Sequence, residues 1–353
     1  MNDERRREAM TYRDAGVDID AQDQALARIR NHLASTKTAG VLSDLGSFGG
    51  LFRVPADVDD PVLVASADGV GTKLMVAWKV GRHDTVGEDL VHHCVNDILV
   101  MGARPLFFLD YFAVGRLDPL VAEQVVAGVA RGCRHAGCAL LGGETAEMPD
   151  MYRPGEYDLA GTIVGIASRG ALLDGSRVGL GDRLLALGSS GLHTNGYTLA
   201  RKIVFDRLGL GPDDELPGTG SSVAEALLAV HRCYLRPVEG LLGSGRLHAL
   251  SHITGGGLTD NLPRVLPEGL SARIDLGSWR VPPLFRTLQQ AGRVPDDDML
   301  RTFNLGVGMV LVVAAEEAEA AIAHCREQGE TCWQLGEIVE GDRQVVYAGG
   351  LGA

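Results

Sequence analysis

The sequence predicts an α/β protein with mixed α+β layers, and three observations support this fold class. Apolar strand-like runs alternate with helical patterns, the 353 residues suit about two domains, and the alternation restarts after a turn-rich segment at about 170–182. We therefore expect domains over residues 11–170 and 171–353. The charged segment at residues 1–10 is expected to be a disordered extension.

In the first domain the expected elements follow one another through short loops. Apolar periodicity and glycine or proline punctuation define them. In order they are a helical lead-in to 37, a glycine-rich loop at 40–50, a strand at 62–67, a helix over 87–102, a strand at 106–114, a helix at 119–137, a strand ending at 144, and a strand ending near 168.

The second domain begins with the strand RLLALGSS at residue 183. A helix opened by SSGLHTNGY follows, and a long helix is expected from Ser222 with an interruption at Pro237. The motif SHITGGG precedes a further helix, and the apolar run NLGVGMVLVV, an Ala/Glu-rich helix at 316–328 and two short strands complete the chain.

Charge and composition exclude several classes of protein. There are 46 acidic and 33 basic residues, and the net charge of −13 disfavours nucleic acid or an anionic membrane as partner. The sequence has no stretch of about 18 apolar residues and no apolar signal segment. Six cysteines without a CxxC pair favour a reducing compartment, so a cytoplasmic location is expected.

Histidines and cysteines occur together at two places and raise the possibility of zinc. One group is His92, His93 and Cys94, and the other is Cys133, His135 and Cys138. The second group falls on an expected helix, where these spacings point the side chains in different directions. The spacing therefore disfavours a zinc site.

The glycine usage points to anion-binding turns. Glycine makes up 47 of 353 residues, about 13% against an ordinary usage of about 7%. Neither GxxxxGK[ST] nor a GxGxxG after a strand occurs. Polar residues flanked by glycine at strand ends and helix starts are the remaining candidates.

The segment ADGVGTK is the first candidate. Asp68 ends a strand, Gly69 and Gly71 let backbone amides approach an anion, and Lys73 can place a positive charge on a phosphate. A tight turn with a solvated lysine is the alternative.

Carboxylates on three different elements suggest a magnesium site. Asp97, beside Asn96, lies in mid-helix, where a short carboxylate needs a partner, and His93 is one turn earlier. Glu144 follows two glycines at a strand end. Together with Asp68 they suit Mg²⁺, which prefers carboxylates and phosphate oxygens. A solvated helix face and unrelated loop acids are the alternatives.

Two later turns could also bind anions. GSSGLHTNGY presents serines, Thr194 and Asn195 at a helix start beside His193, whose side chain titrates near neutrality. SHITGGG places His252, Thr254 and three glycines before another helix. Ordinary helix capping is the alternative for the first turn.

Taken in order, DGVGTK, VNDILVMGA, GGETAEMP, GSSG-H-NGY, TGGG and RTFNLGVGM resemble the phosphoribosylformylglycinamidine cyclo-ligase (aminoimidazole ribonucleotide synthetase) family. The likeness runs from Tyr12 to about Gly336. It implies an ATP-dependent closure of formylglycinamidine ribonucleotide to aminoimidazole ribonucleotide, with release of ADP and phosphate. It also implies a two-domain ATP-binding fold whose N-terminal sheet pairs into a barrel in a homodimer.

The resemblance also implies roles for individual residues. Lys73, Asp97, His193 and His252 would be catalytic, with Lys73 on the γ-phosphate and the two histidines as candidates for proton transfer. Mg²⁺ would be held by Asp68, Asp97 and Glu144. ATP would be bound by Gly46, Gly49, Gly50, Asp68, Gly69, Gly71, Thr72, Lys73, Asn96, Asp97, Gly143, Glu144 and Thr145. The ribonucleotide would be bound by Ser189, Ser190, His193, Asn195, Gly196, Thr254, Gly255, Gly256 and Gly257.

One segment departs from the family pattern. Where the family has Pro-Thr-Arg-Ile-Tyr, this chain has Val230-His231-Arg232-Cys233-Tyr234. The departure would suit a divergent paralogue that acts on a related amidine or formamide. Two further alternatives stay open. One is another ATP-using member of the superfamily, such as a thiamine monophosphate kinase, a selenophosphate synthetase or a hydrogenase-maturation dehydratase. The other is a nucleotide-binding paralogue without catalysis.

Overall fold

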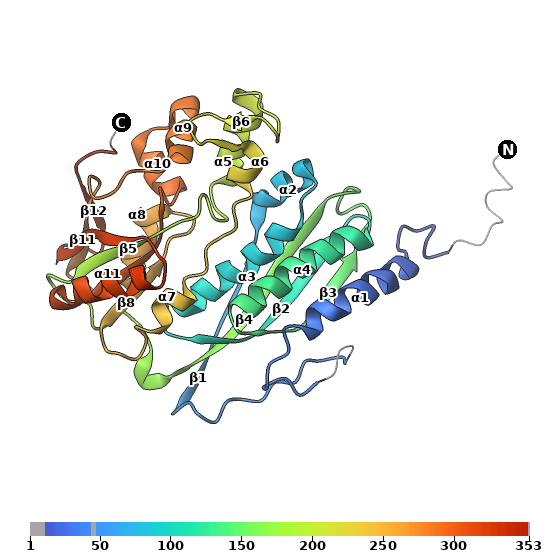
Figure 1. The fold of residues 1–353 in the computed structure, drawn as a ribbon, viewed down its shortest axis with the longest axis horizontal. Coiled ribbons are helices and arrows are strands. Elements are labelled where there is room, and N and C mark those ends of the chain that lie inside the picture. The colour runs from blue at the N-terminus through green and yellow to red at the C-terminus, as the bar shows by residue number, and fades with distance from the viewer. Residues whose placement is uncertain (1–10, 44–46, 352–353) are drawn as a thin grey trace.

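The computed structural model describes residues 11–43 and 47–351, which form two large β-sheets with helices packed on each, and a small sheet of two short strands (Figure 1). The described strands are β1 (Pro61–Gly69), β2 (Arg104–Val114), β3 (Ala139–Glu147), β4 (Tyr157–Ser168), β5 (Arg183–Gly188), β6 (Glu215–Leu216), β7 (Ser221–Ser222), β8 (Leu247–His252), β9 (Leu270–Asp275), β10 (Val307–Val313), β11 (Cys332–Glu340) and β12 (Val345–Ala348). The fold class predicted from the sequence is confirmed.

The α-helices are mostly short in the second half of the chain. They are α1 (Ile19–Ala34), α2 (Leu74–Val80), α3 (Asp84–Leu99), α4 (Pro119–His135), α5 (Tyr197–Arg201), α6 (Val223–Leu227), α7 (Leu235–Glu239), α8 (Gly257–Asn261), α9 (Pro283–Gly292), α10 (Asp296–Thr302) and α11 (Ala318–Glu327). A 3₁₀ turn, η1 (Gly71–Lys73), precedes α2, and a π-helical segment, Lys202–Arg207, continues α5.

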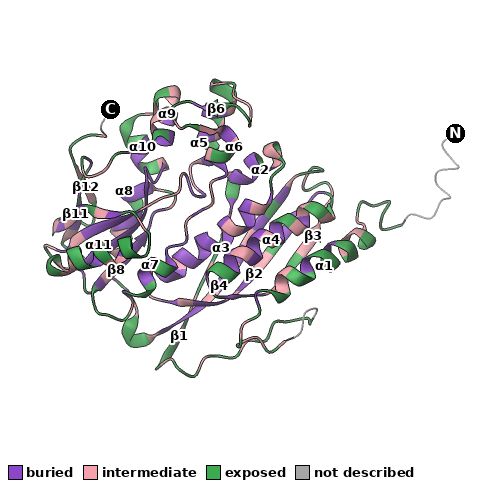
Figure 2. Cartoon of the chain, viewed as in Figure 1, coloured by how far each residue is buried: buried purple, intermediate pink, exposed green. Residues whose placement is uncertain are grey.

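The first sheet has the strand order β1-β4-β2-β3. β4 is antiparallel to both β1 and β2, whereas β2 and β3 are parallel and are joined through α4. Helices α3 and α4 cover one face of this sheet, and α1 packs on α4 (Figure 1). Most residues of α3 and about half of those of α4 are buried, as the purple parts of these helices in Figure 2 show.

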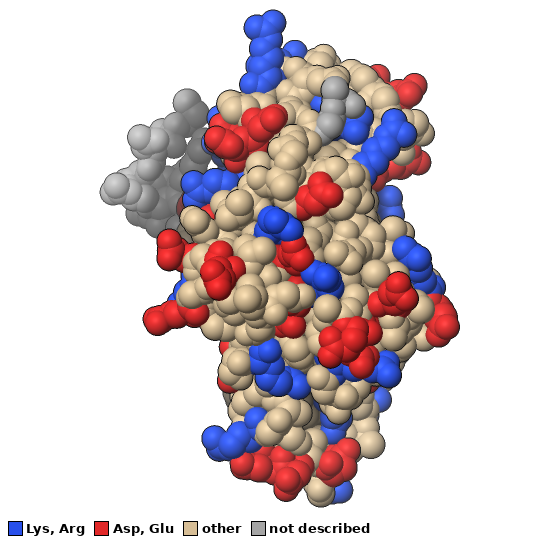
Figure 3. Space-filling view, turned by 90° about the vertical axis from the view of Figure 1, so that its left-hand side faces the viewer, with Lys and Arg blue, Asp and Glu red and all other residues tan. Residues whose placement is uncertain are grey.

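The second sheet has six strands in the order β12-β9-β11-β5-β10-β8. Every residue of β10 is buried, as expected for an apolar strand with neighbours on both sides. The segment at 169–182, which the sequence marked as turn-rich, runs between the two sheets. On the face of the molecule shown in Figure 3, basic and acidic side chains are interspersed.

The prediction of a long helix from Ser222 is wrong. Two five-residue helices, α6 and α7, stand in its place, and the segment 228–234 between them runs without regular structure into the junction of the two halves. Tertiary hydrogen bonds explain why this segment is not helical. The backbone N–H groups of His231 and Tyr234 donate to Asp89 and Asn96 on α3 instead of to helical carbonyls.

The open face of the first sheet carries apolar side chains. Leu63 and Tyr111 are 59% and 41% exposed, and Phe107, Leu109 and Val164 are half-buried. A hollow of about 440 Å³ opens at this sheet, lined in part by Leu109 and Tyr111. In residues 11–43 and 47–351, no helix combines the length and the apolar character that a membrane span requires.

Glycines set the distance between α3 and α4. A Cβ on Gly87 would lie 2.1 Å from the carbonyl oxygen of Val125, and one on Gly128 would lie 2.1 Å from that of Asp84. The helix backbones therefore touch at these positions. We expect Gly87→Ala to lower the free energy of unfolding by roughly 1–3 kcal/mol, because the methyl group forces the helices apart.

Chemical denaturation measures this loss, and Gly170→Ala is the matched control. Gly170 is exposed, and no atom lies within 4 Å of its Cβ position. If the two variants were equally stable, the close approach of α3 and α4 would not explain why glycine is needed at position 87.

Candidate active site

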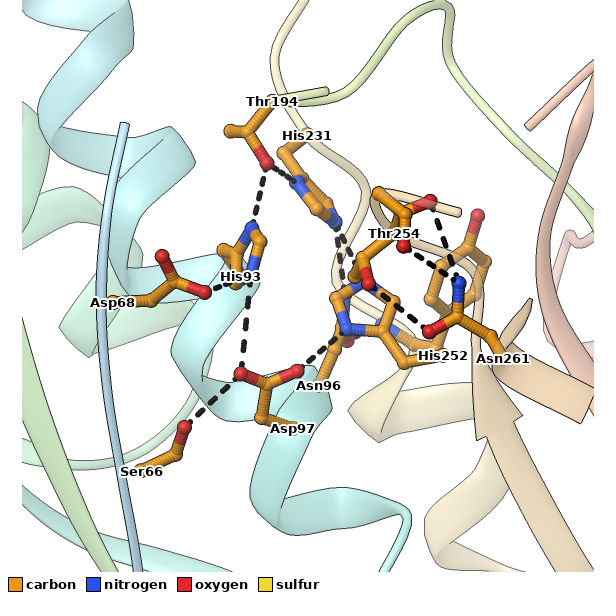
Figure 4. Close-up of polar contacts among 12 residues, drawn as sticks. Ser66, Asp68, His93, Asn96, Asp97, Thr194, His231, His252, Thr254 and Asn261 are labelled. Carbon is orange, nitrogen blue, oxygen red and sulfur yellow. Dashed lines mark hydrogen bonds and ion pairs between the residues drawn. The ribbon is translucent and has the colours of Figure 1, made fainter. Parts of the chain in front are cut away.

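The candidate site lies where α3 and the end of β1 meet three loops of the second domain (Figure 4). These loops span residues 189–196, 228–234 and 252–257. Helix α3 presents Asp89, His92, His93 and Asn96 toward the junction, all buried, with Asp97 beside them. Their spacings of three and four residues place them along one side of the helix.

Lys73 and Asp89 form an ion pair that is fully buried at the junction. The Lys73 Nζ and Asp89 Oδ2 atoms are 2.8 Å apart, and both side chains have no exposed surface. Lys73 also donates to the backbone carbonyls of His193 (3.1 Å) and Ala229 (2.7 Å). Asp89 accepts from the backbone N–H of His231 (2.7 Å). The pair thus fastens two loops of the second domain to the first.

This arrangement does not fit the phosphate contact expected for Lys73. The ammonium group faces an aspartate and two carbonyl oxygens inside the protein. Burial lowers the pKa of Lys73 and raises the pKa of Asp89, and the attraction between the two charges opposes both shifts. The structure gives Lys73 a role in joining the domains.

Asn96 also holds the second domain instead of facing a nucleotide. Its Oδ1 accepts from the backbone N–H of Tyr234 (2.9 Å), and its Nδ2 donates to the carbonyl of Arg232 (2.8 Å). Both ends of the buried amide are therefore used on the 228–234 segment. The ATP contact expected for Asn96 is not present in this arrangement.

Asp68 and Asp97 do come together, on either side of His93. The His93 Nε2 atom lies 2.7 Å from Asp68 Oδ2 and 3.8 Å from Asp97 Oδ2. The Asp68 and Asp97 side chains are 45% and 26% exposed, so both carboxylates reach the surface of the junction. The pair is the part of the expected magnesium site that the structure assembles.

Neighbouring groups keep this carboxylate pair ionised. Burial acts to raise the pKa of Asp97, but contacts with His252, His93 and Ser66 outweigh it and lower the pKa. Burial acts in the same way on Asp68, and the contact with His93 again leaves its pKa below the ordinary value. Burial alone would lower the pKa of His93, yet the two aspartates raise it.

A continuous polar network of side chains extends from the carboxylates into the second domain (Figure 4). His93 Nδ1 lies 2.6 Å from Thr194 Oγ1, which is 3.4 Å from His231 Nδ1. His231 Nε2 lies 3.1 Å from His252 Nε2, and His252 Nδ1 lies 2.8 Å from Asp97 Oδ1. The network therefore links Asp97 and His93 of the first domain to Thr194, His231 and His252 of the second.

The proton-transfer role expected for His193 and His252 finds no support in these contacts. Both rings are buried, and burial lowers the pKa of each. His193 stacks on His231 with centroids 4.0 Å apart, and its Nε2 accepts from the N–H of Ser190 (3.2 Å). His252 bonds to Asp97 and His231. The structure therefore favours a positioning role for both.

The two turns expected to bind substrate lie next to each other. A Cβ on Gly255 would be 3.2 Å from Asn195 Oδ1. Asn261 Nδ2 donates to the carbonyl of Gly257 (2.8 Å), and Thr254 Oγ1 donates to Asn261 Oδ1 (3.3 Å), so α8 holds the glycine turn. Gly196 and Gly256 have φ values of 77° and 99°, which glycine adopts without strain.

The serine hydroxyls are bound within the protein. Ser189 Oγ donates to the carbonyl of Gly191 (3.1 Å), and Ser190 Oγ donates to that of Val230 (2.5 Å). In this structure the hydroxyls stabilise the turn itself. The substrate contacts expected of these two serines stay a prediction.

Glu144 lies away from Asp68 within one chain. β1 and β3 are opposite edges of the four-stranded sheet, so about 14 Å of strand spacing separates them. The strand register also places Glu144 on the face of Tyr111 and Ala160, whereas Asp68 shares the helix-covered face with Gly161. The three carboxylates expected at one metal do not converge in a single chain.

The other expected ATP-binding residues are divided between the same two edges. Thr72 Oγ1 lies 3.0 Å from Thr198 Oγ1 of the second domain, and Gly71 has a φ of 64°. Gly143 leaves room for the Asp110 carboxyl, whose Oδ1 would be 2.1 Å from an added Cβ. Gly50 lies against Leu141 of β3. The remaining positions are Gly69 at the end of β1, the exposed Gly49, Thr145 on β3, and Gly46, which lies outside the described residues.

Two residues at the centre of the junction, Asp89 and His231, were not among the site residues predicted from the sequence. A signal for Asp89 was available, because it lies four residues before His93 and seven before Asn96 on an amphipathic helix. His231 was noted only as a departure from a family pattern. Its position between His193 and His252 follows from the loop path, which no spacing in the sequence reveals.

Comparison with known proteins identifies the family of this chain. Residues 32–167 match the family described as AIR synthase related protein, N-terminal domain, and residues 179–349 match its C-terminal domain. The chain belongs to the AIR synthase related protein family. The family resemblance drawn from the motifs is therefore confirmed.

Several curated members of this family are similar over nearly their whole length. The phosphoribosylformylglycinamidine cyclo-ligase of Sorangium cellulosum is 54% identical over 94% of this chain and 96% of its own. That of Trichlorobacter lovleyi is 52% identical, covering 93% and 94%, and that of Geobacter sulfurreducens is 52% identical, covering 94% and 95%.

Solved structures with other names share the fold. The thiamine-monophosphate kinase of Stenotrophomonas maltophilia has a TM-score of 0.70 at 21% identity, covering 93% of this chain and 97% of its own. A HypE hydrogenase maturation protein in complex with ATP has a TM-score of 0.58 at 22% identity, covering 92% and 89%. Both identities are far below those of the cyclo-ligases, so these likenesses concern the fold alone.

The buried ion pair provides a test of the role of Lys73. Lys73→Met leaves the Asp89 carboxylate buried without its counter-charge, and we expect the free energy of unfolding to fall by about 3–5 kcal/mol. In Lys73→Met/Asp89→Asn, the amide is neutral and still accepts from the N–H of His231, so much of the loss is recovered. Chemical denaturation of both variants measures the coupling. A single variant as stable as the native protein would contradict the joining role.

Proposed function

We propose that this chain catalyses the ATP-dependent ring closure of formylglycinamidine ribonucleotide to aminoimidazole ribonucleotide, with release of ADP and phosphate. The Asp68–Asp97 pair at the domain junction carries this proposal, because two partly exposed carboxylates of the kind that Mg²⁺ prefers lie next to the loops expected to bind substrate. The names and identities of the relatives support the same reaction.

The carboxylates of Asp68 and Asp97 suit a Mg²⁺ ion bound together with a nucleotide. Mg²⁺ prefers one or two carboxylates together with phosphate oxygens and water, and two ionised, partly exposed aspartates meet that requirement. Bound Mg-ATP would supply the γ-phosphoryl group that turns the formyl oxygen into a leaving group. Asp68 and Asp97 are the residues that would hold it.

The remaining residues act by positioning. His252 donates from Nδ1 to Asp97 Oδ1, and Ser66 donates to Asp97 Oδ2, so the direction of this carboxylate is fixed from two sides. His93 places its ring between the two aspartates and reduces their mutual repulsion. Catalysis by such a site rests on alignment and on charge neutralisation.

The substrate is proposed to lie between the 189–196 and 254–257 turns. Their side-by-side position brings Asn195 and the glycine backbone near the surface where Asp68 and Asp97 are exposed. Backbone N–H groups in glycine turns suit the phosphate of a ribonucleotide. The Lys73–Asp89 and Asn96 contacts keep these loops at a fixed distance from α3.

To test the proposal, purified protein is incubated with ATP, Mg²⁺ and formylglycinamidine ribonucleotide, and the amounts of ADP and of aminoimidazole ribonucleotide are measured over time. We expect equal amounts of the two products. We expect Asp97→Asn to reduce kcat/KM on the order of 100-fold or more, because one ionised ligand at the reacting phosphate is lost. Its thermal unfolding midpoint should stay close to the native value.

Asp342→Asn is the matched control, since Asp342 is an exposed aspartate in the turn between β11 and β12 of the second sheet. It should retain native turnover. ADP without the imidazole would indicate another ATP-using reaction of this fold, and no ADP would indicate a nucleotide-binding paralogue. Unchanged turnover in Asp97→Asn would remove Asp97 from the magnesium site.

We further propose that the chain is a homodimer through the open face of its first sheet. The exposed Leu63 and Tyr111, with three half-buried apolar neighbours, form a continuous apolar area on one face. Glu144 lies on this open face, away from Asp68 of its own chain. It can join an Asp68–Asp97 pair only if a second copy supplies it.

Leu63→Asp places a charge in the middle of this proposed interface. We expect light scattering to give a mass near 37.4 kDa for the variant and twice that for the native protein. Leu180→Asp is the control, because Leu180 is 63% exposed in the segment between the two sheets. A native protein that is monomeric at assay concentrations would contradict the proposal.

A further inference from the structure

Three groups of His, Asp or Glu side chains among the described residues have ligand atoms close enough to share a metal ion, and one of them lies between α3 and α4, outside the carboxylate pair. Glu88 and His92 are one turn apart on α3, and His135 is the last residue of α4. One donor atom from each of the three lies within 4.8 Å of the others. The cysteines considered in the sequence analysis are buried and do not belong to this group.

The distances suit a small divalent ion. His135 Nδ1 and His92 Nε2 are 3.1 Å apart, and His92 Nε2 and Glu88 Oε1 are 3.9 Å apart. Ligands at 2.0–2.2 Å in a tetrahedron lie about 3.4 Å from each other. In the present structure His135 Nδ1 donates to His92 Nε2, so an ion would take the place of the proton between these two nitrogens.

Contacts behind the ligands already set their orientation. His92 Nδ1 lies 2.7 Å from the carbonyl oxygen of His231, and because a carbonyl only accepts, the proton must be on Nδ1. Nε2 then has its lone pair toward Glu88 and His135. Arg131 Nε donates to Glu88 Oε2 (2.5 Å), which leaves Oε1 toward His92. Such hydrogen bonds behind the ligands are typical of metal sites.

The group is also accessible and available. His135 is exposed, and a cavity of about 370 Å³ lined by His92 and His135 opens beside it. An ion can therefore enter from solvent.

We propose that Glu88, His92 and His135 form a binding site for a divalent transition-metal ion of the Zn²⁺ type. Two nitrogens and one carboxylate oxygen give three protein ligands, and the exposed side leaves a fourth position for water. The group shares no residue with the His93, Asp97 and His252 cluster beside the carboxylate pair, and its two nitrogens and one oxygen suit Zn²⁺ better than Mg²⁺.

The site lies directly behind the domain junction. An ion held there would connect α3 to the end of α4, and through His92 Nδ1 it would fix the carbonyl of His231. The same segment carries the contacts to Asp89 and Asn96. Occupancy therefore stabilises the native arrangement of the two domains, and the unfolding midpoint rises with metal concentration. This site does not depend on the cyclo-ligase activity.

Co²⁺ is the probe, because low-symmetry nitrogen ligation gives it strong visible absorption. The full-length chain without a histidine tag is freed of metal and titrated with CoCl₂ in excess Mg²⁺, which fills the carboxylate pair. We expect saturable absorption that Zn²⁺ abolishes, together with a rise in the unfolding midpoint. In His135→Gln, half-saturation should need at least about tenfold more Co²⁺.

The control is His248→Gln, which removes a half-buried histidine on β8 of the second domain and should keep native Co²⁺ binding. His135→Gln should also keep native turnover, since His135 lies outside the proposed catalytic machinery. His231→Thr tests the buried histidines His193, His231 and His252, whose ring nitrogens also lie close together. Absence of the Co²⁺ signal in the native chain, or its loss in His231→Thr with retention in His135→Gln, would overturn the proposal.

Discussion

The buried ion pair between Lys73 and Asp89 is the contact on which the rest of the junction depends. Two opposite charges with no exposed surface are stable only beside each other and with further polar partners. Lys73 donates to the carbonyls of His193 and Ala229, and Asp89 accepts from the N–H of His231. The loops that carry them are therefore held against α3 at one defined position.

Helix α3 makes this arrangement possible because its two sides have different chemistry. Val91, Val95 and Ile98 are buried in the core of the first domain. On the other side, Asp89, His93 and Asn96 are just as buried, yet each is paired with the second domain. A polar stripe buried in this way connects the domains through hydrogen bonds whose loss would leave unpaired groups.

The same stripe ends at the exposed carboxylates, and this explains how a binding site can be both ordered and charged. Asp68 and Asp97 stay ionised because histidines and a serine surround them on the inner side, while solvent reaches them on the outer side. His92 lies on the same helix, but its Nε2 atom contacts Glu88 and His135 instead of the carboxylate pair. One helix thus supplies oxygen ligands at one place and nitrogen ligands at another.

The sequence by itself determined the fold class, the family and the residues of the carboxylate pair. Strand and helix periodicity are local, and the motifs around Asp68 and Asp97 are long enough to be specific. It could not determine that Lys73 would be buried or that Glu144 would lie on the open face, because both follow from strand register and domain contact. The path of residues 228–234 was decided by hydrogen bonds to α3, 135 or more residues earlier in the chain. Only the tertiary structure brings such distant groups together, since no local pattern records them.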